Sequence, residues 1–176
     1  MDLPWDQGDP TPIVLLSFST VTEQASLRSL QSALDALGDL PVHVIGATAA
    51  VDPADLDVPP NASLSRYLDH EVAMQRAALV VGHGGHGTTM RALGHGLPIV
   101  GIPAGGVDQT RITELVQEWG AGRALPHDAD ADAIRDAAAD ILDHPSFRDH
   151  AARIAEMLEG VDGTSLAADS VESLLT

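Results

Sequence analysis

The chain has 176 residues, and its apolar content of 44% is enough for the core of one ordinary domain. Its 9 basic and 26 acidic residues give a net charge of −17, which argues against nucleic acid or an anionic membrane as a partner. Because the chain has no cysteine, disulfides and thiolate metal sites are excluded. With no signal-peptide pattern at its start and no apolar run of about 20 residues, we expect a cytoplasmic protein without a membrane span.

The first part of the chain predicts a linker followed by alternating strands and helices. Residues 1–12 contain three prolines, a glycine and several acids, a composition typical of a linker between domains. The run PIVLLSFST (12–20) is continuously apolar until its hydroxylated end, which predicts a strand buried on both faces. A helix with apolar residues at helical spacing follows, from a cap at Thr22 to Leu37. Further elements are predicted at 41–47 (strand), 63–68 (strand), 69–78 (helix) and 78–83 (strand).

The second part continues this alternation. It predicts a helix at 88–95, a strand at 98–104, a helix at 107–119, a brief strand at 122–126, and helices at 129–142, 145–159 and 163–175. The pattern predicts an α/β fold over residues 13–176, with a doubly wound, Rossmann-like parallel sheet. Ligands of such sheets bind beyond the carboxyl ends of the strands. The informative turns are therefore those at 17–20, 82–88 and 103–109.

The turn HGGHGT (83–88) has the composition of an anion site. The start of a helix carries free N–H groups and a partial positive charge, and glycine removes the Cβ atoms that would hold a phosphate away. This attraction acts at short range, whereas the charge of the whole protein is screened over about 8–10 Å. His83 and His86 would add side-chain donors. A tight crossover between strand and helix would also explain the glycines.

Other chemistries fit this turn less well. His83 and His86 have the spacing of two metal ligands on one helical face, but no third ligand lies nearby in the sequence. The oxyanion loop of lipase-like hydrolases needs a G-x-S-x-G nucleophile elbow, which the sequence lacks. A Walker loop needs a following G-K-[ST], which is also missing. We therefore expect no metal.

The ordered motif HGGHGTTMRALGHGLP (83–98), followed by PAGGVDQ (103–109), resembles the donor-binding signature of family 1 glycosyltransferases of the GT-B fold, of the bacterial antibiotic- and lipid-modifying type. The resemblance extends from PIVLLSFST, which is similar to the opening strand of the family's C-terminal domain, to DGTSLAADSVESLL (162–175), which is similar to its closing helix. It implies the donor-binding domain of an inverting enzyme that moves a sugar from a nucleoside diphosphate to a hydroxyl acceptor without a metal or a cofactor.

The resemblance also implies roles for individual residues. The diphosphate would be held by the glycine turn and by a hydroxyl after the first strand: His83, Gly84, Gly85, His86, Gly87, Thr88 and Thr20. The segment from Tyr67 to His70 would line the pocket of the base. Asp108 and Gln109 would form hydrogen bonds with the sugar hydroxyls. From the residues alone, Asp108 could instead cap the helix that begins near it, and Tyr67 could be a core residue.

Three parts of the sequence depart from the family pattern. After Gln109, the chain has Ile112 and Thr113 in place of the last two residues of the family's D-Q-x-x-N-A. Arg91 stands where the family often has a glutamate that grips the ribose hydroxyls. Relatives that use deoxythymidine sugars often lack that glutamate, so either UDP or dTDP could carry the sugar. Arg91 could also pair with phosphate or lie on a solvated helix face. Asp69 stands where the family has a proline.

A GT-B enzyme has two domains, and the resemblance assigns this chain only the donor-binding one. The family's N-terminal domain binds the acceptor and carries the catalytic base, so we expect no catalytic base here and an isolated chain that is inactive. We expect a fragment, or a chain that works with a separate acceptor-domain chain; an exposed domain interface would also favour a homodimer. The alternative is a non-catalytic helper or degenerate binding subunit with the same fold.

Overall fold

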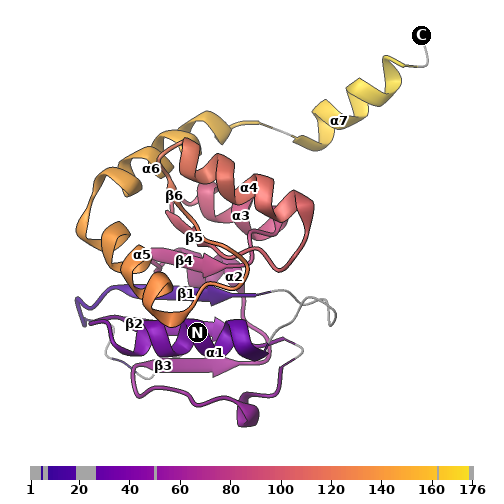
Figure 1. Ribbon diagram of the computed structural model, residues 1–176. Helices are drawn as coiled ribbons and strands as arrows, with labels where there is room; N and C mark the ends of the chain where they lie inside the picture. Colours follow the sequence, from indigo (N-terminus) through magenta and orange to yellow (C-terminus); the bar gives the residue numbers. More distant parts are fainter. Residues whose placement is uncertain (1–4, 6–7, 19–26, 50, 162, 175–176) are drawn as a thin grey trace.

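The computed structural model describes residue 5 and residues 8–18, 27–49, 51–161 and 163–174 (Figure 1). Six strands of this part of the chain form one parallel sheet in the order β3-β2-β1-β4-β5-β6. The strands are β1 Ile13–Ser17, β2 His43–Ala47, β3 Ala62–Ser65, β4 Leu79–Gly82, β5 Ile99–Gly101 and β6 Gly122–Ala124. The predicted doubly wound α/β fold is therefore confirmed.

Helices cover both faces of the sheet. They are α1 Leu27–Gly38, α2 His70–Met74, α3 His86–Gly94, α4 Val107–Glu118, α5 Ala131–Asp143, α6 Ser146–Leu158 and α7 Gly163–Glu172, with a 3₁₀ turn η1 at Pro53–Asp55. Apolar residues of β1 alternate between two cores: Val14 and Leu16 pack with α1 and α5, whereas Leu15 packs with α2, α3, α4 and α6. Because β1 is buried on both faces, its sequence is continuously apolar.

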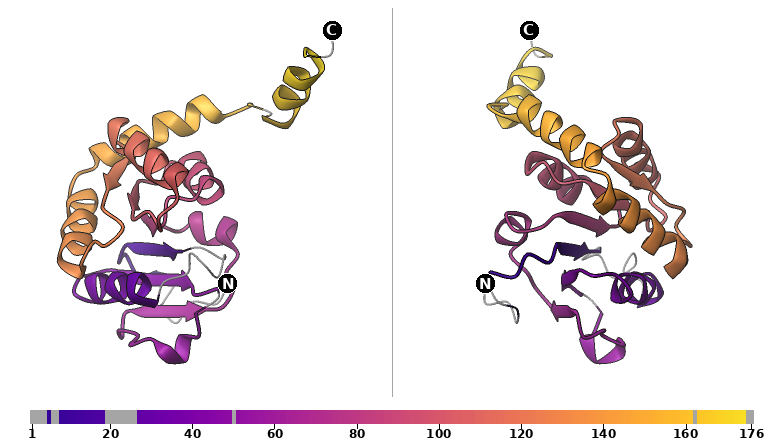
Figure 2. Two further views of the ribbon diagram at one scale, coloured as in Figure 1. Left: turned by 45° about the vertical axis from the view of Figure 1, so that its right-hand side comes forward. Right: turned by 90° about the vertical axis from the view of Figure 1, so that its left-hand side faces the viewer.

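The helix α7 stands apart from the rest of the fold (Figures 1 and 2). Its apolar residues Leu166 and Val171 are exposed, and so is Leu174 just beyond its end. No described helix is long and apolar enough to cross a membrane.

The described residues of the segment 1–12 contact the amino end of β2. The ring of Trp5 stacks on the ring of His43, with 4.1 Å between their centroids. The carboxylate of Asp9 lies 2.8 Å from Nε2 of the same histidine. Hydrogen bonds from Thr11, and then from His43, lower the pKa of Asp9 to about 2. This part of the segment is thus anchored to the domain.

The helix after the glycine turn begins at His86, so the predicted start at Thr88 is wrong. Gly85 occupies the N-cap position in an extended conformation, and its carbonyl accepts a hydrogen bond from the N–H of Thr89. His86 and Gly87 therefore belong to the first helical turn, and the connection from β4 consists of His83, Gly84 and Gly85.

The connection packs tightly against α4, and this contact requires glycine. Gly84 has a φ of +72°, and a Cβ atom there would lie 2.4 Å from Cγ2 of Thr113. At Gly85 a Cβ atom would lie 2.4 Å from Nε2 of His83. A Cβ atom at Gly87 would meet nothing within 4 Å. A tight crossover therefore explains Gly84. At Gly85 the neighbour is the His83 ring, which could turn aside, and at Gly87 the packing gives no reason for glycine.

This contrast gives a test of the packing. We expect Gly84→Ala to lower the free energy of unfolding by about 2–4 kcal/mol, because alanine is strained at positive φ and its methyl group overlaps Thr113. Gly87→Ala should leave stability unchanged or raise it by about 0.5–1 kcal/mol, because alanine is the better helix former. Urea unfolding of both variants measures the difference, and equal stability of the two would contradict the described packing.

Candidate functional site

The candidate site lies where the chain reverses its direction of travel across the sheet. From β1 the chain moves outward to β2 and β3, and then returns to pair β4 with the other side of β1. Parallel sheets leave a crevice beyond the carboxyl ends of the strands at such a point. Here these ends are Ser17 and Gly82, which are directly paired. The connections after β4 and β5 lead out from this edge of the sheet.

Three backbone N–H groups at the start of α3 are available to a ligand. Gly85 is the N-cap and has no side chain that could bond to the helix start. Its carbonyl oxygen accepts a hydrogen bond from the N–H group of Thr89. The N–H groups of His86, Gly87 and Thr88 form no hydrogen bond with any described residue outside the helix. The residues His86 and Gly87 are exposed. The helix start therefore presents free donors and the positive end of its dipole at the crevice.

His83 lies beside these donors and is half-buried. Its Nδ1 is 3.5 Å from the carbonyl oxygen of Ser17. Burial lowers the pKa of His83, while the Ser17 carbonyl and the charge of Asp108 act in the opposite direction. The effect of Asp108 shows that the structure brings these two predicted site residues, one after β4 and one after β5, close enough to interact.

Asp108 is exposed in the first turn of α4 and does not cap that helix. The N-cap is Gly106, and no side-chain hydrogen bond caps this end of the helix. The alternative interpretation of Asp108 as a helix cap is therefore wrong. Its carboxylate remains accessible at the edge of the crevice, where it can accept hydrogen bonds from hydroxyl groups.

Gln109 has a different environment from its neighbour. Its side chain is only 4% exposed, and its Oε1 accepts a hydrogen bond of 2.8 Å from the N–H of Ala104. This bond holds the connection between β5 and α4 in place. A contact between Gln109 and a sugar stays a prediction.

The segment from Tyr67 to His70 reaches the crevice through its histidine. Nε2 of His70 is 2.8 Å from Oγ of Ser17, and Nδ1 is 3.1 Å from the carbonyl oxygen of Leu68. Tyr67 is 83% exposed, so the alternative of a core tyrosine is wrong. The strand predicted at 63–68 ends at Ser65, which leaves Tyr67 in the loop before α2.

Asp69 and Arg91 flank His70. Asp69 is the N-cap of α2, and its carboxylate accepts hydrogen bonds from the N–H groups of Glu71 and Val72, which gives a physical reason for an acid at this position. Burial lowers the pKa of His70, and the positive charge of Arg91 lowers it further. Arg91 is exposed, and it lies near enough to His70 for its charge to act on the ring.

Thr20 falls outside the described residues. Ser17, which did not receive a role from the sequence, contacts two histidines of the site, His70 and His83. The signal that could have identified it is a hydroxyl at the end of a continuously apolar strand, directly before the turn at 17–20.

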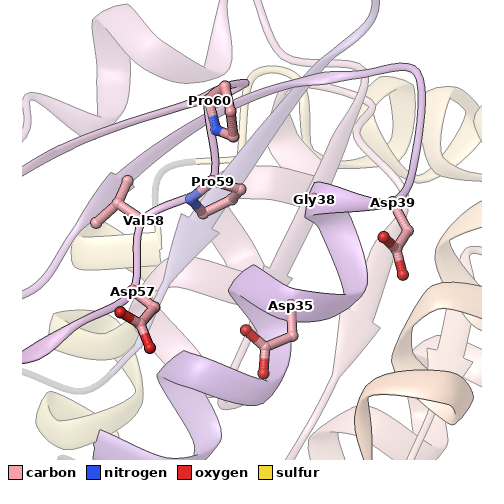
Figure 3. Close-up of a pocket in the computed structure, with 7 residues that line it drawn as sticks. All are labelled: Asp35, Gly38, Asp39, Asp57, Val58, Pro59 and Pro60. Carbon is pink, nitrogen blue, oxygen red and sulfur yellow. The ribbon is translucent and has the colours of Figure 1, made fainter.

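Two other features do not form a comparable site. Within the described part of the chain, no group of three or more His, Cys, Asp or Glu residues could hold a metal ion, so His83 and His86 lack a third ligand there. A cavity of about 540 Å³ lies at the opposite edge of the sheet, near the end of α1 (Figure 3). The carboxylates of Asp35, Asp39 and Asp57 line it, and their charge would repel an anion.

Comparisons with known proteins identify relatives of this chain. A family model described as the erythromycin biosynthesis protein CIII-like C-terminal domain matches residues 31–171. A PGL/p-HBAD biosynthesis glycosyltransferase of Mycobacterium tuberculosis is 36% identical over 155 residues, which are 86% of this chain and 35% of the relative. The chain thus spans about a third of the length of this curated relative.

Solved structures share the fold. The calicheamicin glycosyltransferase CalG4 superimposes with a TM-score of 0.80 at 25% identity, over 97% of this chain and 44% of that one. The glycosyltransferase VinC, solved in complex with dTDP, gives a TM-score of 0.76 at 24% identity, over 88% of this chain and 39% of that one. The chain therefore belongs to the erythromycin CIII-like C-terminal domain family, and the resemblance of its motifs to GT-B glycosyltransferases is confirmed.

Proposed function

We propose that this chain binds the nucleoside diphosphate of a sugar donor, as the donor half of an inverting glycosyltransferase that acts on a hydroxyl acceptor. The observation that carries the proposal is the set of free N–H groups of His86, Gly87 and Thr88 at the switch point of the sheet. Membership of the family and the dTDP held by the related VinC structure support it.

In this proposal the start of α3 binds the diphosphate and stabilises it as a leaving group. Negative charge grows on the diphosphate as the bond to the sugar breaks, and fixed N–H donors lower the energy of that charge without reorganising. Gly87 leaves room for the phosphate oxygens, because no protein atom lies near its missing side chain. His83 donates a further hydrogen bond, and the carboxylate of Asp108 accepts hydrogen bonds from the sugar.

The nucleotide base and the acceptor hydroxyl bind away from the diphosphate site. The loop from Tyr67 to His70 contacts the base of the nucleotide, which is UDP or dTDP. An N-terminal acceptor-binding domain, in the same chain or in a separate one, supplies the acceptor and the catalytic base. In this proposal Arg91, whose charge acts on His70, also contacts the nucleotide.

Calorimetric titration with UDP and dTDP tests the proposal. We expect at least one of them to bind, and His83→Ala to weaken that binding about tenfold to hundredfold, the loss that corresponds to a hydrogen bond with a charged group. Thermal stability should stay nearly unchanged, because the one hydrogen bond of the His83 ring is long.

His144→Ala is the matched control, since His144 lies at the end of α5 and its side chain is 62% exposed. This variant should bind nucleotide like the unmodified chain. Absence of binding of both nucleotides at millimolar concentration would overturn the proposal and favour the helper subunit.

Donor binding should strengthen as the pH falls from about 8 to about 6. Burial lowers the pKa of His83 in the free chain, and an adjacent pyrophosphate would raise it, so that binding takes up a proton. A nucleotide sugar is the suitable ligand, because both of its phosphates are diesters that do not titrate in this range. Titration in two buffers of different ionisation enthalpy measures the proton uptake. It should diminish in His83→Ala; a pH-independent affinity would contradict the role of His83.

The isolated chain should not transfer sugar. The described site contains donors for a leaving diphosphate, but the proposal places the base that activates the acceptor in another domain. Incubation with a nucleotide sugar and a hydroxyl acceptor, followed by mass spectrometry, measures transfer. Turnover by the purified chain alone would contradict this division of labour.

A further inference from the structure

We propose that Ser17 is a positioning residue that ties the loop at 66–69 to the connection at 83–85, and so fixes the spacing at which the two ends of a nucleoside diphosphate are held. This inference rests on the proposed function and deepens it. It concerns a residue that touches neither end of the ligand itself.

Ser17 makes contacts in three directions from the end of β1. Its backbone pairs with Gly82, where a Cβ atom would lie 2.3 Å from the Ser17 carbonyl oxygen. The same carbonyl faces Nδ1 of His83 at 3.5 Å. Its hydroxyl lies 2.8 Å from Nε2 of His70. One buried residue thus connects both predicted ligand-binding segments to the centre of the sheet.

The chemistry of His70 gives the hydroxyl bond a direction. The carbonyl oxygen of Leu68 can only accept, so Nδ1 of His70 carries the hydrogen and donates it. In the neutral ring Nε2 is then the acceptor, and the Ser17 hydroxyl donates to it. Burial, and to a smaller extent the charge of Arg91, lowers the pKa of His70 and keeps the ring neutral.

A serine hydroxyl that donates to a histidine is also the arrangement of a nucleophile and its base. Ser17, however, is only 2% exposed, so no external substrate can reach its oxygen. The second nitrogen of His70 bonds to a backbone carbonyl and not to a carboxylate. The pair therefore serves to hold the loop and not to attack a substrate.

The two ligand-binding segments differ in how much they depend on Ser17. The connection at 83–85 is also held by its close packing on Thr113 of α4, which does not involve the Ser17 hydroxyl. The loop at 66–69 is attached to the end of β1 through His70, whereas its first half is held by other hydrogen bonds of Arg66 and Tyr67. Removing the hydroxyl should therefore loosen the loop at its His70 end and leave the phosphate-binding end in place.

The experiment compares two ligands in the full chain. Inorganic pyrophosphate contacts only the phosphate end, whereas UDP or dTDP spans both ends. We expect Ser17→Ala to weaken nucleotide binding about tenfold while pyrophosphate binding changes less than twofold. Thr48→Val is the matched control, because Thr48 is 3% exposed near the end of β2 and its hydroxyl has no partner among the described residues. It should change neither affinity.

Histidine variants test whether the bond itself matters. In His70→Gln the carboxamide oxygen can still accept from Ser17, so amide exchange in residues 66–70 of the ligand-free chain should stay slow. His70→Ala should speed that exchange as Ser17→Ala does, and combining the two should add little, because they break the same bond. Equal losses for nucleotide and pyrophosphate in Ser17→Ala, or no loss for either, would overturn the inference.

Hydrogen exchange separates this inference from the proposed function. In the ligand-free chain, Ser17→Ala should speed amide exchange in residues 66–70 and leave residues 83–89 unchanged. If the unmodified chain bound none of the three ligands, the proposed function would fail, and the ligand-spacing role would fail with it. If the ligands bound but exchange at 66–70 stayed the same, only the inference about Ser17 would be overturned.

Discussion

The pairing of β1 with β4 is the constraint on which the site depends. The two strands meet at the only reversal of strand order in the described sheet, and Ser17 is directly opposite Gly82. No side chain fits at Gly82, because the Ser17 carbonyl occupies its place. This close approach brings the histidine that follows β4 to the end of β1 and points the start of α3 into the crevice. The location of the site is therefore a property of the backbone as much as of any side chain.

The same arrangement explains how a chain of net charge −17 can offer a place for a diphosphate. Attraction comes from amide groups and a helix dipole, whose effect is confined to the first helical turn. The first turn of α3 contains no acidic residue, and three carboxylates line the cavity at the opposite edge of the sheet. Two acids do lie in the site: Asp69 caps α2, and the sugar hydroxyls assigned to Asp108 need an acceptor.

Much of the fold could be predicted because each strand and helix carries a local pattern. The apolar run at 12–20 indicated a buried strand, and β1 occupies its centre. The start of α3 was misplaced by two residues because Gly85 caps the helix through its backbone conformation and not through a side chain that the sequence would reveal. Tyr67 shows a similar limit, since an aromatic residue near a strand is typical of a core and this one is exposed.

The site was predictable where it depends on a continuous motif and not where it depends on contacts between distant segments. The turn at 83–88 carried its chemistry in consecutive residues. The bond between Ser17 and His70 joins residues 53 positions apart, and each of them alone is an ordinary serine or histidine. The inward orientation of Gln109 was likewise hidden, because its partner is a backbone N–H that any residue at position 104 other than proline would provide.

The close packing of Thr113 against two glycines limits how the site can move. Cβ atoms placed at Gly84 and at Gly101 would both collide with its methyl group, so α4 sits against the turn and against β5 at once. If the turn or β5 moved along α4, the other would have to move with it. The helix α4, the strand β5 and the turn therefore form a rigid unit. A Cβ atom at Gly105, by contrast, would meet nothing within 4 Å, so the tip of the connection between β5 and α4 is not packed in this way.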